Sequence, residues 1–162
     1  MKNRSEIRRA QQTDATHIAE LIDTTSVACC FSSEQACPEW CKKSIQPNQI
    51  ADLVKSAQMG WLVAVEQKTL VGVLAVSDKS QVKYFFVHPA HQKLGIGKQL
   101  WNIALRTGVL GNLLTVRSSL FAVPVYERLG FKAVEPPVFF KGMHYRTMVA
   151  DYEQLGARSR TS

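Results

Sequence analysis

The sequence predicts a mixed α/β fold in which an antiparallel meander leads into a β–α–β unit. Three apolar runs, at residues 61–66, 70–77 and 82–87, are separated only by short turn-forming segments, which is typical of hairpin-connected strands. A glycine-containing loop and a helical repeat follow the third run, and another apolar run occupies residues 113–117. Because such a crossover joins parallel neighbours, we expect a sheet of mixed direction.

Length and composition predict one globular domain over residues 1–162, with a core at about 5–152 and a polar tail, 153–162, that frays. No apolar run approaches the length of a membrane span, and the polar start contains no signal-peptide core, so the cytoplasm is the expected compartment. The net charge of +7 would suit a nucleic acid or a phosphate-rich cofactor. The basic residues are scattered and lack an aromatic–basic stripe, which argues against nucleic acid.

The cysteines all lie in one short segment, as Cys29, Cys30, Cys37 and Cys41. They form no C-x-x-C pair of the kind that zinc sites use, so no metal site is expected. Without a secretory context, disulfides are not expected either. Buried thiols in a helical region are the main interpretation, and a redox-sensitive or metal-binding cluster is the alternative.

Before the meander we expect one edge strand and helical segments. Residues 6–10 predict the strand, and Thr13 is placed to cap the helix that follows. Residues 24–45 are harder to interpret and suggest short helical pieces. A further helix is expected at about 48–57.

After the meander the pattern predicts a helix at 98–108, and a second helix that begins near Pro124 and ends at Gly130. A strand at 131–135 should be cut short by the prolines that follow it. Residues 144–152 alternate well enough to form the last strand.

The loop between the third strand and the next helix has the features of an anion site. Gly95 and Gly97 let the backbone approach a ligand closely, and Lys93 and Lys98 add two positive charges. The first N–H groups of a helix have no intrahelical acceptor, and the helix dipole adds partial positive charge there. The sequence therefore predicts a phosphate-binding loop.

Two common phosphate loops do not fit this segment. A Walker A loop needs a glycine at position 92 and a Ser or Thr after Lys98, but Gln92 and Gln99 stand there. A dinucleotide fingerprint needs a third glycine where Leu100 stands.

The remaining pattern, Gln92-x-x-Gly95-x-Gly97, resembles the acetyl-CoA loop of the GNAT superfamily of N-acetyltransferases, Gln/Arg-x-x-Gly-x-Gly/Ala. A later segment, Ser119-x-x-Ala122-x-x-x-Tyr126-x-x-x-Gly130-Phe131, is similar to the family's Asn-x-x-Ala-x-x-x-Tyr-x-x-x-Gly-Phe. Serine stands where asparagine is common, which weakens a specific contact to the cofactor arm. The motifs occur in the family's order, and the resemblance spans residues 5–152.

The resemblance implies a mostly antiparallel sheet of six to seven strands with about four flanking helices. The parallel strands 82–87 and 113–117 would splay apart and hold the pantetheine arm of acetyl-CoA between them. By resemblance, the backbone of Phe86 and Val87 would bind the arm and the acetyl carbonyl, and Ser119 would contact the arm. The loop that would hold the pyrophosphate comprises Gln92, which shapes it, and Lys93, Leu94, Gly95, Ile96, Gly97 and Lys98.

The resemblance also implies an acyltransferase that moves acetyl to a primary amine in a ternary complex. Tyr126 is the expected general acid, since a phenol of pKa about 10 can protonate a thiolate whose conjugate acid lies near 8.5. Alternatively, its ring only packs and contacts the sulfur. Strand 82–87 has no carboxylate to act as base, so a water relay is favoured over the side chains Glu34, Glu66, His88 and His91.

The acceptor site is expected over regions 24–58 and 136–146, where an apolar pocket could include Phe31, Trp40, Phe139 and Phe140. The acceptor is expected to be a small-molecule or peptide amine, with a small-molecule amine, an amino acid and a protein N-terminus all open, and the family resemblance is compatible with a homodimer. Two other functions stay open at this point. One is a catalytically weak acyl-CoA-binding sensor, suggested by the missing carboxylate, and the other is a basic nucleic-acid-binding protein.

Overall fold

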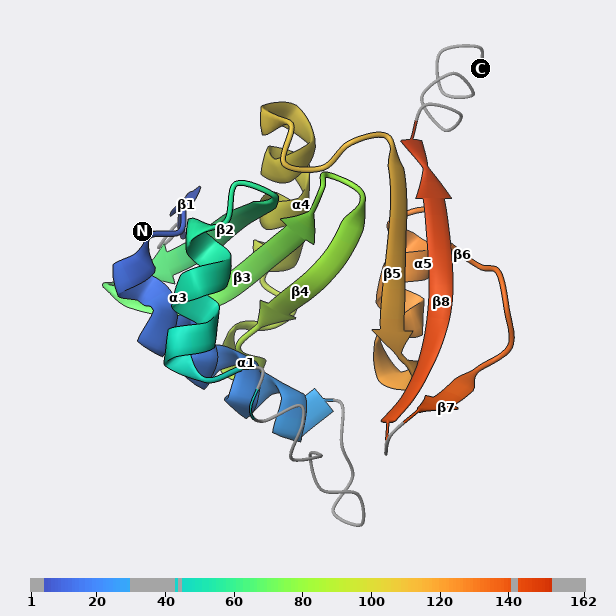
Figure 1. The fold of residues 1–162 in the computed structure, drawn as a ribbon, viewed down its shortest axis with the longest axis horizontal. Helices are drawn as coiled ribbons and strands as arrows, with labels where there is room; N and C mark the ends of the chain where they lie inside the picture. Colours follow the sequence, from blue (N-terminus) through green and yellow to red (C-terminus); the bar gives the residue numbers. More distant parts are fainter. Residues whose placement is uncertain (1–4, 30–42, 44, 141–142, 153–162) are drawn as a thin grey trace.

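The computed structural model describes residues 5–29, 43, 45–140 and 143–152 (Figure 1). Within these residues the chain forms an eight-stranded sheet of order β1-β2-β3-β4-β5-β8-β6, and β7 pairs with β8. The strands are β1 (Glu6–Arg9), β2 (Met59–Glu66), β3 (Thr69–Ser77), β4 (Gln81–Val87), β5 (Leu113–Ser119), β6 (Lys132–Ala133), β7 (Val138–Phe140) and β8 (Met143–Asp151). The α-helices of this part are α1 (Ala15–Cys29), α3 (Pro47–Lys55), α4 (Ile96–Thr107) and α5 (Val123–Arg128).

The meander predicted from the apolar runs is confirmed. Strands β2, β3 and β4 pair antiparallel in sequence order, and β1 forms the edge beside β2. The β2–β3 hairpin turns through Gln67 and Lys68, both with positive φ, as a two-residue turn requires for the twist of the strands. The βαβ unit is also confirmed, because β4 and β5 run parallel.

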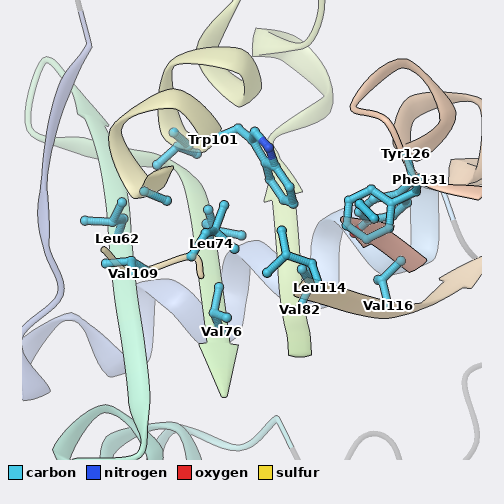
Figure 2. Close-up of a cluster of buried hydrophobic side chains, with 14 of the residues drawn as sticks. Leu62, Leu74, Val76, Val82, Trp101, Val109, Leu114, Val116, Tyr126 and Phe131 are labelled. Atoms are coloured by element: carbon cyan, nitrogen blue, oxygen red, sulfur yellow. The ribbon is translucent and has the colours of Figure 1, made fainter. Parts of the chain in front are cut away.

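Helices cover both faces of the meander, which explains why β2 and β3 are apolar on both sides. On one face, α1 and α3 pack against a cluster that includes Trp61, Val63 and Val73. On the other face, α4 packs Leu100 and Trp101 against a second cluster that extends to β5 and β8 (Figure 2).

The parallel strands stay together over two residue pairs only, Gln81 with Thr115 and Val82 with Val116. On the other side of β4 the register with β3 shifts at this same point, so Lys83 is an extra, bulged residue. A β-bulge bends its strand and sharpens the local twist. Strand β4 therefore turns away from β5 (Figure 1), while β5 continues alongside β8 over its whole length. The splay that the family resemblance implies is confirmed.

Several element boundaries differ from those predicted. Helix α4 begins at Ile96 instead of 98, because Gly95 supplies the left-handed turn at its N-cap. Thr13 is not the N-cap of the first helix; it lies inside a 3-10 turn, Gln12–Asp14, that leads into α1. The predicted strand 131–135 shrinks to β6, and the unpredicted β7 forms only after the two prolines have interrupted the ladder.

The entry to α1 is fixed by Asp14. Its carboxylate accepts two hydrogen bonds from the Arg8 guanidinium, at 2.8 and 2.9 Å, and one from the Gln11 backbone N–H, at 2.7 Å. The hydrogen bonds from Arg8 lower the pKa of Asp14, against the opposing effect of burial. The charged carboxylate thus ties the edge strand β1 to the start of α1.

We expect Asp14→Asn to lower the free energy of unfolding by about 1–2 kcal/mol at pH 7, because the amide loses the charge-assisted bonds to a partly exposed arginine. A carboxyl whose folded pKa is depressed stabilises the protein above its unfolded pKa, about 3.9, and loses that contribution as pH falls through the folded value. Urea unfolding at pH 7 and at pH 3 should therefore show that the loss of unfolding free energy in Asp14→Asn, relative to wild type, is smaller at pH 3. Asp23→Asn, at an exposed position of α1, is the control, and a pH-independent deficit would contradict the assignment.

Candidate functional site

The chain leaves β4 through a 3-10 turn, Pro89–His91, and enters α4 at a left-handed glycine. Gly95 has φ +85° and is the N-cap of α4, a conformation that glycine adopts without strain. Helix geometry leaves the N–H groups of Ile96, Gly97 and Lys98 without intrahelical acceptors, and no acidic residue lies in this first turn. The helix start therefore offers an anion a set of donors with no competing carboxylate on the helix itself.

The side chains of the loop divide into two groups. Lys93 and Lys98 are exposed beside the helix start, and Leu94 is 66% exposed. Ile96, in contrast, is buried in the α4 cluster and anchors the first turn to the sheet. The lysine charges thus face solvent where an anionic ligand would approach.

Gly97 of α4 lies against the end of β4. A Cβ at this position would lie 3.5 Å from Phe85 Cζ and 3.6 Å from Val87 Cγ2, which is ordinary van der Waals contact. Its φ is not in the left-handed region, so the backbone does not require glycine there. Position 97 therefore tolerates a methyl group toward the protein, and larger or charged side chains would enter the space beside the end of β4.

The end of β4 is tied to the loop by Gln92, whose Nε2 donates to the Val87 carbonyl at 2.9 Å. Next along the strand, the His88 N–H donates to Val71 O at 2.8 Å, so His88 faces β3. Residues of an antiparallel ladder alternate in the side they face, so the peptide groups of Phe86, paired with Val73, also face β3. The Val87 N–H consequently faces away from β3, toward the open side of the splay.

Tyr126 lies on the β5 side of the splay, on α5, which contacts β5. It is 6% exposed on α5, with ring centroids 5.3 Å from Phe131 and 6.2 Å from Phe85 of β4. Phe85 also contacts Trp101, at 5.4 Å, so one aromatic group spans β4, α4 and α5. Figure 2 shows Trp101, Tyr126 and Phe131 on the same face of the sheet.

Ser119 ends β5 and turns the chain into α5. Its Oγ accepts a hydrogen bond from the Ala122 N–H at 3.2 Å, which caps the short 3-10 turn Leu120–Ala122. A hydroxyl that accepts in this way keeps its own proton for another acceptor. Ser119 thus caps this turn, and its hydroxyl hydrogen can still be donated to another acceptor.

The described candidate bases differ in their contacts. Glu66, at the end of β2, lies 3.9 Å from His91 Nε2, an ion pair only when the imidazole is protonated. His91 Nδ1 is buried with no hydrogen-bond partner among the described residues, and His88 Nδ1 accepts a hydrogen bond from the Ala90 N–H. Glu34 lies outside the described residues. None of the described candidates projects from β4 itself, where the sequence already lacks a carboxylate.

Much of the expected acceptor region also lies outside the described residues, including Phe31, Trp40 and the side chain of Phe140. Phe139 of β7 is 60% exposed, and its ring lies 4.7 Å from that of His144. Of the cysteines, Cys29 is the last residue of α1, and Cys30, Cys37 and Cys41 lie outside the described residues.

Two kinds of site are absent from the described residues. No group of three or more His, Cys, Asp or Glu side chains gathers where it could hold a metal ion. No helix in this part of the chain is both long enough and apolar enough to cross a membrane.

A partly buried chain of hydrogen bonds joins the two sides of the splay. Trp101 Nε1 of α4 donates to the Tyr152 hydroxyl at 2.8 Å, and that hydroxyl donates to the Leu129 carbonyl after α5. The Tyr152 N–H also donates to Asn112 O at 2.7 Å. Burial raises the pKa of Tyr152, so its hydroxyl remains protonated at neutral pH and can donate.

The comparisons with known proteins agree with this geometry. The chain matches the acetyltransferase (GNAT) domain family over residues 31–152 and therefore belongs to that family. No curated protein sequence matches the chain significantly.

Solved structures show the same fold. A GCN5-related N-acetyltransferase from Rhodopseudomonas palustris superposes with a TM-score of 0.74 at 18% identity, covering 93% of this chain and 98% of that one. The PaiA N-acetyltransferase from Thermoplasma acidophilum, in complex with coenzyme A, has a TM-score of 0.71 at 17% identity, covering 94% of this chain and 100% of that one. The putative acetyltransferase YncA from Salmonella typhimurium, with acetyl-CoA, has a TM-score of 0.66 at 19% identity, covering 91% of this chain and 94% of that one.

We expect Tyr152→Phe to lower the free energy of unfolding by about 1–3 kcal/mol, because Trp101 Nε1 and the Leu129 carbonyl would both lose a buried partner. Urea unfolding measures the loss. Tyr145→Phe removes the same atom from a tyrosine on β8 whose ring lies against Arg117, and serves as the control. Equal effects of the two changes would show that the chain of hydrogen bonds contributes nothing.

Proposed function

We propose that this protein is an acetyl-CoA-dependent N-acetyltransferase that moves the acetyl group from the thioester to a primary amine by direct attack in a ternary complex. Membership of the GNAT family supports acetyl transfer in general. The observation that carries the specific proposal is the open edge of β4, at Val87, next to an unpaired helix N-terminus at Gly95.

In this proposal the cofactor is held mainly by backbone. The N–H groups from Lys93 to Lys98 bind the pyrophosphate, Gln92 keeps the loop against β4, and Ser119 donates to the pantetheine arm. Val87 supplies the N–H that faces the arm and the acetyl carbonyl. The peptide groups of Phe86 face β3 and its side chain packs in the α1 cluster, so the backbone contact expected of Phe86 is left out of this proposal. Coenzyme A in the PaiA structure and acetyl-CoA in the YncA structure support a coenzyme A ligand here.

The chemistry needs a neutral amine, a polarised carbonyl and a protonated leaving group. An amine of pKa about 10.4 costs roughly 4–5 kcal/mol to deprotonate at neutral pH. The amine nitrogen attacks the carbonyl carbon, and an N–H at Val87 stabilises the developing oxyanion by about 3 kcal/mol. The C–S bond then breaks, the thiolate takes the Tyr126 proton, and solvent reprotonates Tyr126. Water carries the amine proton away, since β4 has no carboxylate that could take it.

The acceptor is proposed only as a small-molecule or peptide amine. Other structures of this fold include an aminoglycoside 6′-acetyltransferase and a chimeric spermidine N-acetyltransferase, so the scaffold serves chemically different amines. No described residue of this chain singles out one of these classes.

A catalytically weak acyl-CoA sensor is the second candidate, favoured by the lack of a carboxylate on β4. Two measurements separate the candidates. Titration calorimetry with acetyl-CoA tests binding, and thiol release with a panel of spermidine, kanamycin, free amino acids and a short peptide tests transfer. Binding of acetyl-CoA with no turnover on any amine supports the sensor. If calorimetry detects no binding at millimolar coenzyme A, both the transferase and the sensor are excluded.

We expect Gly97→Asp to weaken coenzyme A binding at least 10-fold, because it adds a negative charge to the helix turn whose N–H groups would hold the phosphates. The same carboxylate interacts favourably with the helix dipole, so the melting temperature should not fall for electrostatic reasons. Gly97→Ala is the matched control, since a methyl group makes only ordinary contacts there. Calorimetry gives the affinities, and an unchanged Kd in Gly97→Asp would refute the phosphate site.

Tyr126→Phe should lower kcat by about 100-fold while leaving coenzyme A affinity within a factor of about two, because the ring packing stays and the acidic proton is lost. Steady-state thiol release and calorimetry on the same preparations check both values. Wild-type turnover in this variant would leave Tyr126 with a packing role only.

A further inference from the structure

The opening between β4 and β5 is accessible from one side of the sheet. On the α4 side, the ring of Phe85 contacts the rings of Trp101 and Tyr126, which fill the space beside β4. On the α1 side, Tyr84 and Phe86 of β4 pack in the α1 cluster. The α1 side of β5 is different, because α5 lies behind β5 and β8 and no described helix lies in front of these two strands (Figure 1). An acceptor can therefore approach the opening over this side of β5.

Arg117 lies on the uncovered side of β5. Val116, the residue before it, pairs with Val82 of β4, and both valines are buried in the cluster on the α4 side. Successive residues of a strand point to opposite faces, so Arg117 points to the α1 side. It is exposed, and it is the first residue of β5 beyond the last pair with β4. Its side chain therefore starts where the splay begins.

A second cationic residue stands at the same point on the other strand. Lys83 is the first residue of β4 beyond the last pair, as Arg117 is of β5, and it is also exposed. Neither forms an ion pair with a carboxylate in the part of the chain that the structure describes. Thr147, the cross-strand partner of Arg117, donates instead to Glu135, at 2.5 Å. The narrow end of the opening thus has two positive charges that no described ion pair compensates.

The guanidinium of Arg117 is held against an aromatic ring. Its Cζ lies 5.4 Å from the centroid of the Tyr145 ring, within the range of a cation–π contact. Tyr145 pairs with Ser119, so the side chain of Arg117 leans along β5 toward the level of Ser119. A guanidinium stacked in this way keeps its in-plane N–H groups for the two oxygens of a carboxylate. Arg117 therefore offers a carboxylate site beside the serine that faces the pantetheine arm in the proposed function.

We propose that the acceptor is a free amino acid whose carboxylate binds Arg117 while its amine attacks the thioester. This inference rests on the function proposed above and names its acceptor class. Counted on from the paired residues, Ser119 is level with Phe85. Val87 lies two residues further, a rise of about 7 Å along an extended strand. A short molecule that makes contacts at both ends is long enough for this rise.

The charge of Arg117 also separates acceptor classes. A positive group near an amine disfavours its ammonium form, which cannot attack the thioester. The same charge repels polycations such as spermidine and kanamycin, whereas a carboxylate on the acceptor compensates it. The transfer step is the one given above: the amine nitrogen bonds to the acetyl carbon, the C–S bond breaks, and the carboxylate keeps its charge throughout.

The first test compares matched amines with wild-type protein, by thiol release at saturating acetyl-CoA. 4-Aminobutanoate and butylamine differ mainly in the carboxylate, and glycine, β-alanine and glutamate vary its distance from the amine. We expect kcat/KM for the best amino acid to exceed that for butylamine roughly 10- to 100-fold, the size of a charge-assisted pair of hydrogen bonds. Equal values would overturn the proposal. Faster turnover of an amidated peptide without acidic residues would also overturn it, in favour of a peptide acceptor.

The second test removes the carboxylate site. Arg117→Gln should lower the ratio of kcat/KM for that amino acid to kcat/KM for butylamine at least 10-fold, mainly through KM of the acceptor, with an unchanged Kd for acetyl-CoA. Arg117→Lys keeps the charge without the planar fork and should give an intermediate ratio. Arg9→Gln removes the same charge at an exposed position of β1, at the far edge of the sheet, and should match wild type.

A melting curve shows that each variant is folded, and Arg117→Lys supplies the comparison if Arg117→Gln is not. A wild-type ratio in folded Arg117→Gln would overturn the role of Arg117. A loss of acetyl-CoA affinity with an unchanged ratio would also overturn it, because the arginine would then serve the cofactor.

The outcomes separate this inference from the function on which it rests. Wild-type protein that binds acetyl-CoA and acetylates butylamine or spermidine as well as any amino acid removes only the acceptor class. Wild-type protein that releases no thiol with any amine removes the transferase function and the inference with it.

Discussion

The architecture of the site depends on one interruption of backbone pairing. Strands β4 and β5 are parallel neighbours that share two residue pairs, and the bulged Lys83 bends β4 away immediately afterwards. From Lys83 to Val87 the side of β4 that faces β5 has no strand partner in the described sheet. A sheet edge with free peptide groups is costly inside a protein unless something else satisfies it. In this family member, the unpaired edge lies next to the helix start that can bind an anion, so one extended ligand could use both.

Such an interruption weakens the link between the two halves of the sheet, and side chains restore it. Phe85 on β4 contacts Trp101 and Tyr126, which belong to helices on opposite sides of the splay. The Tyr152 hydroxyl then joins Trp101 to the Leu129 carbonyl by hydrogen bonds. The opening is thus held at a defined width by aromatic rings and one partly buried hydroxyl, while the backbone edge of β4 has no strand partner.

Features with a strong period or a local chemical cause were predictable from the sequence. The meander, the parallel pair and the loop before α4 were found because apolar runs and Gly95 have direct conformational meaning. The bulge at Lys83 was not predictable, because one inserted residue leaves no compositional signal and depends on the register of the neighbouring strand. The same applies to Tyr152, whose role follows from contacts between distant segments. Which of Phe86 and Val87 faces the splay likewise required the ladder register.

The β2–β3 hairpin has a separate practical meaning. Gln67 and Lys68 both adopt left-handed backbone conformations, which are strained for residues that carry a Cβ. An Asn-Gly pair at these two positions would suit the turn better. The native residues at this hairpin tip are therefore not the most stable choice. Replacing them can raise the thermal stability of the fold without changing the backbone that faces the cofactor.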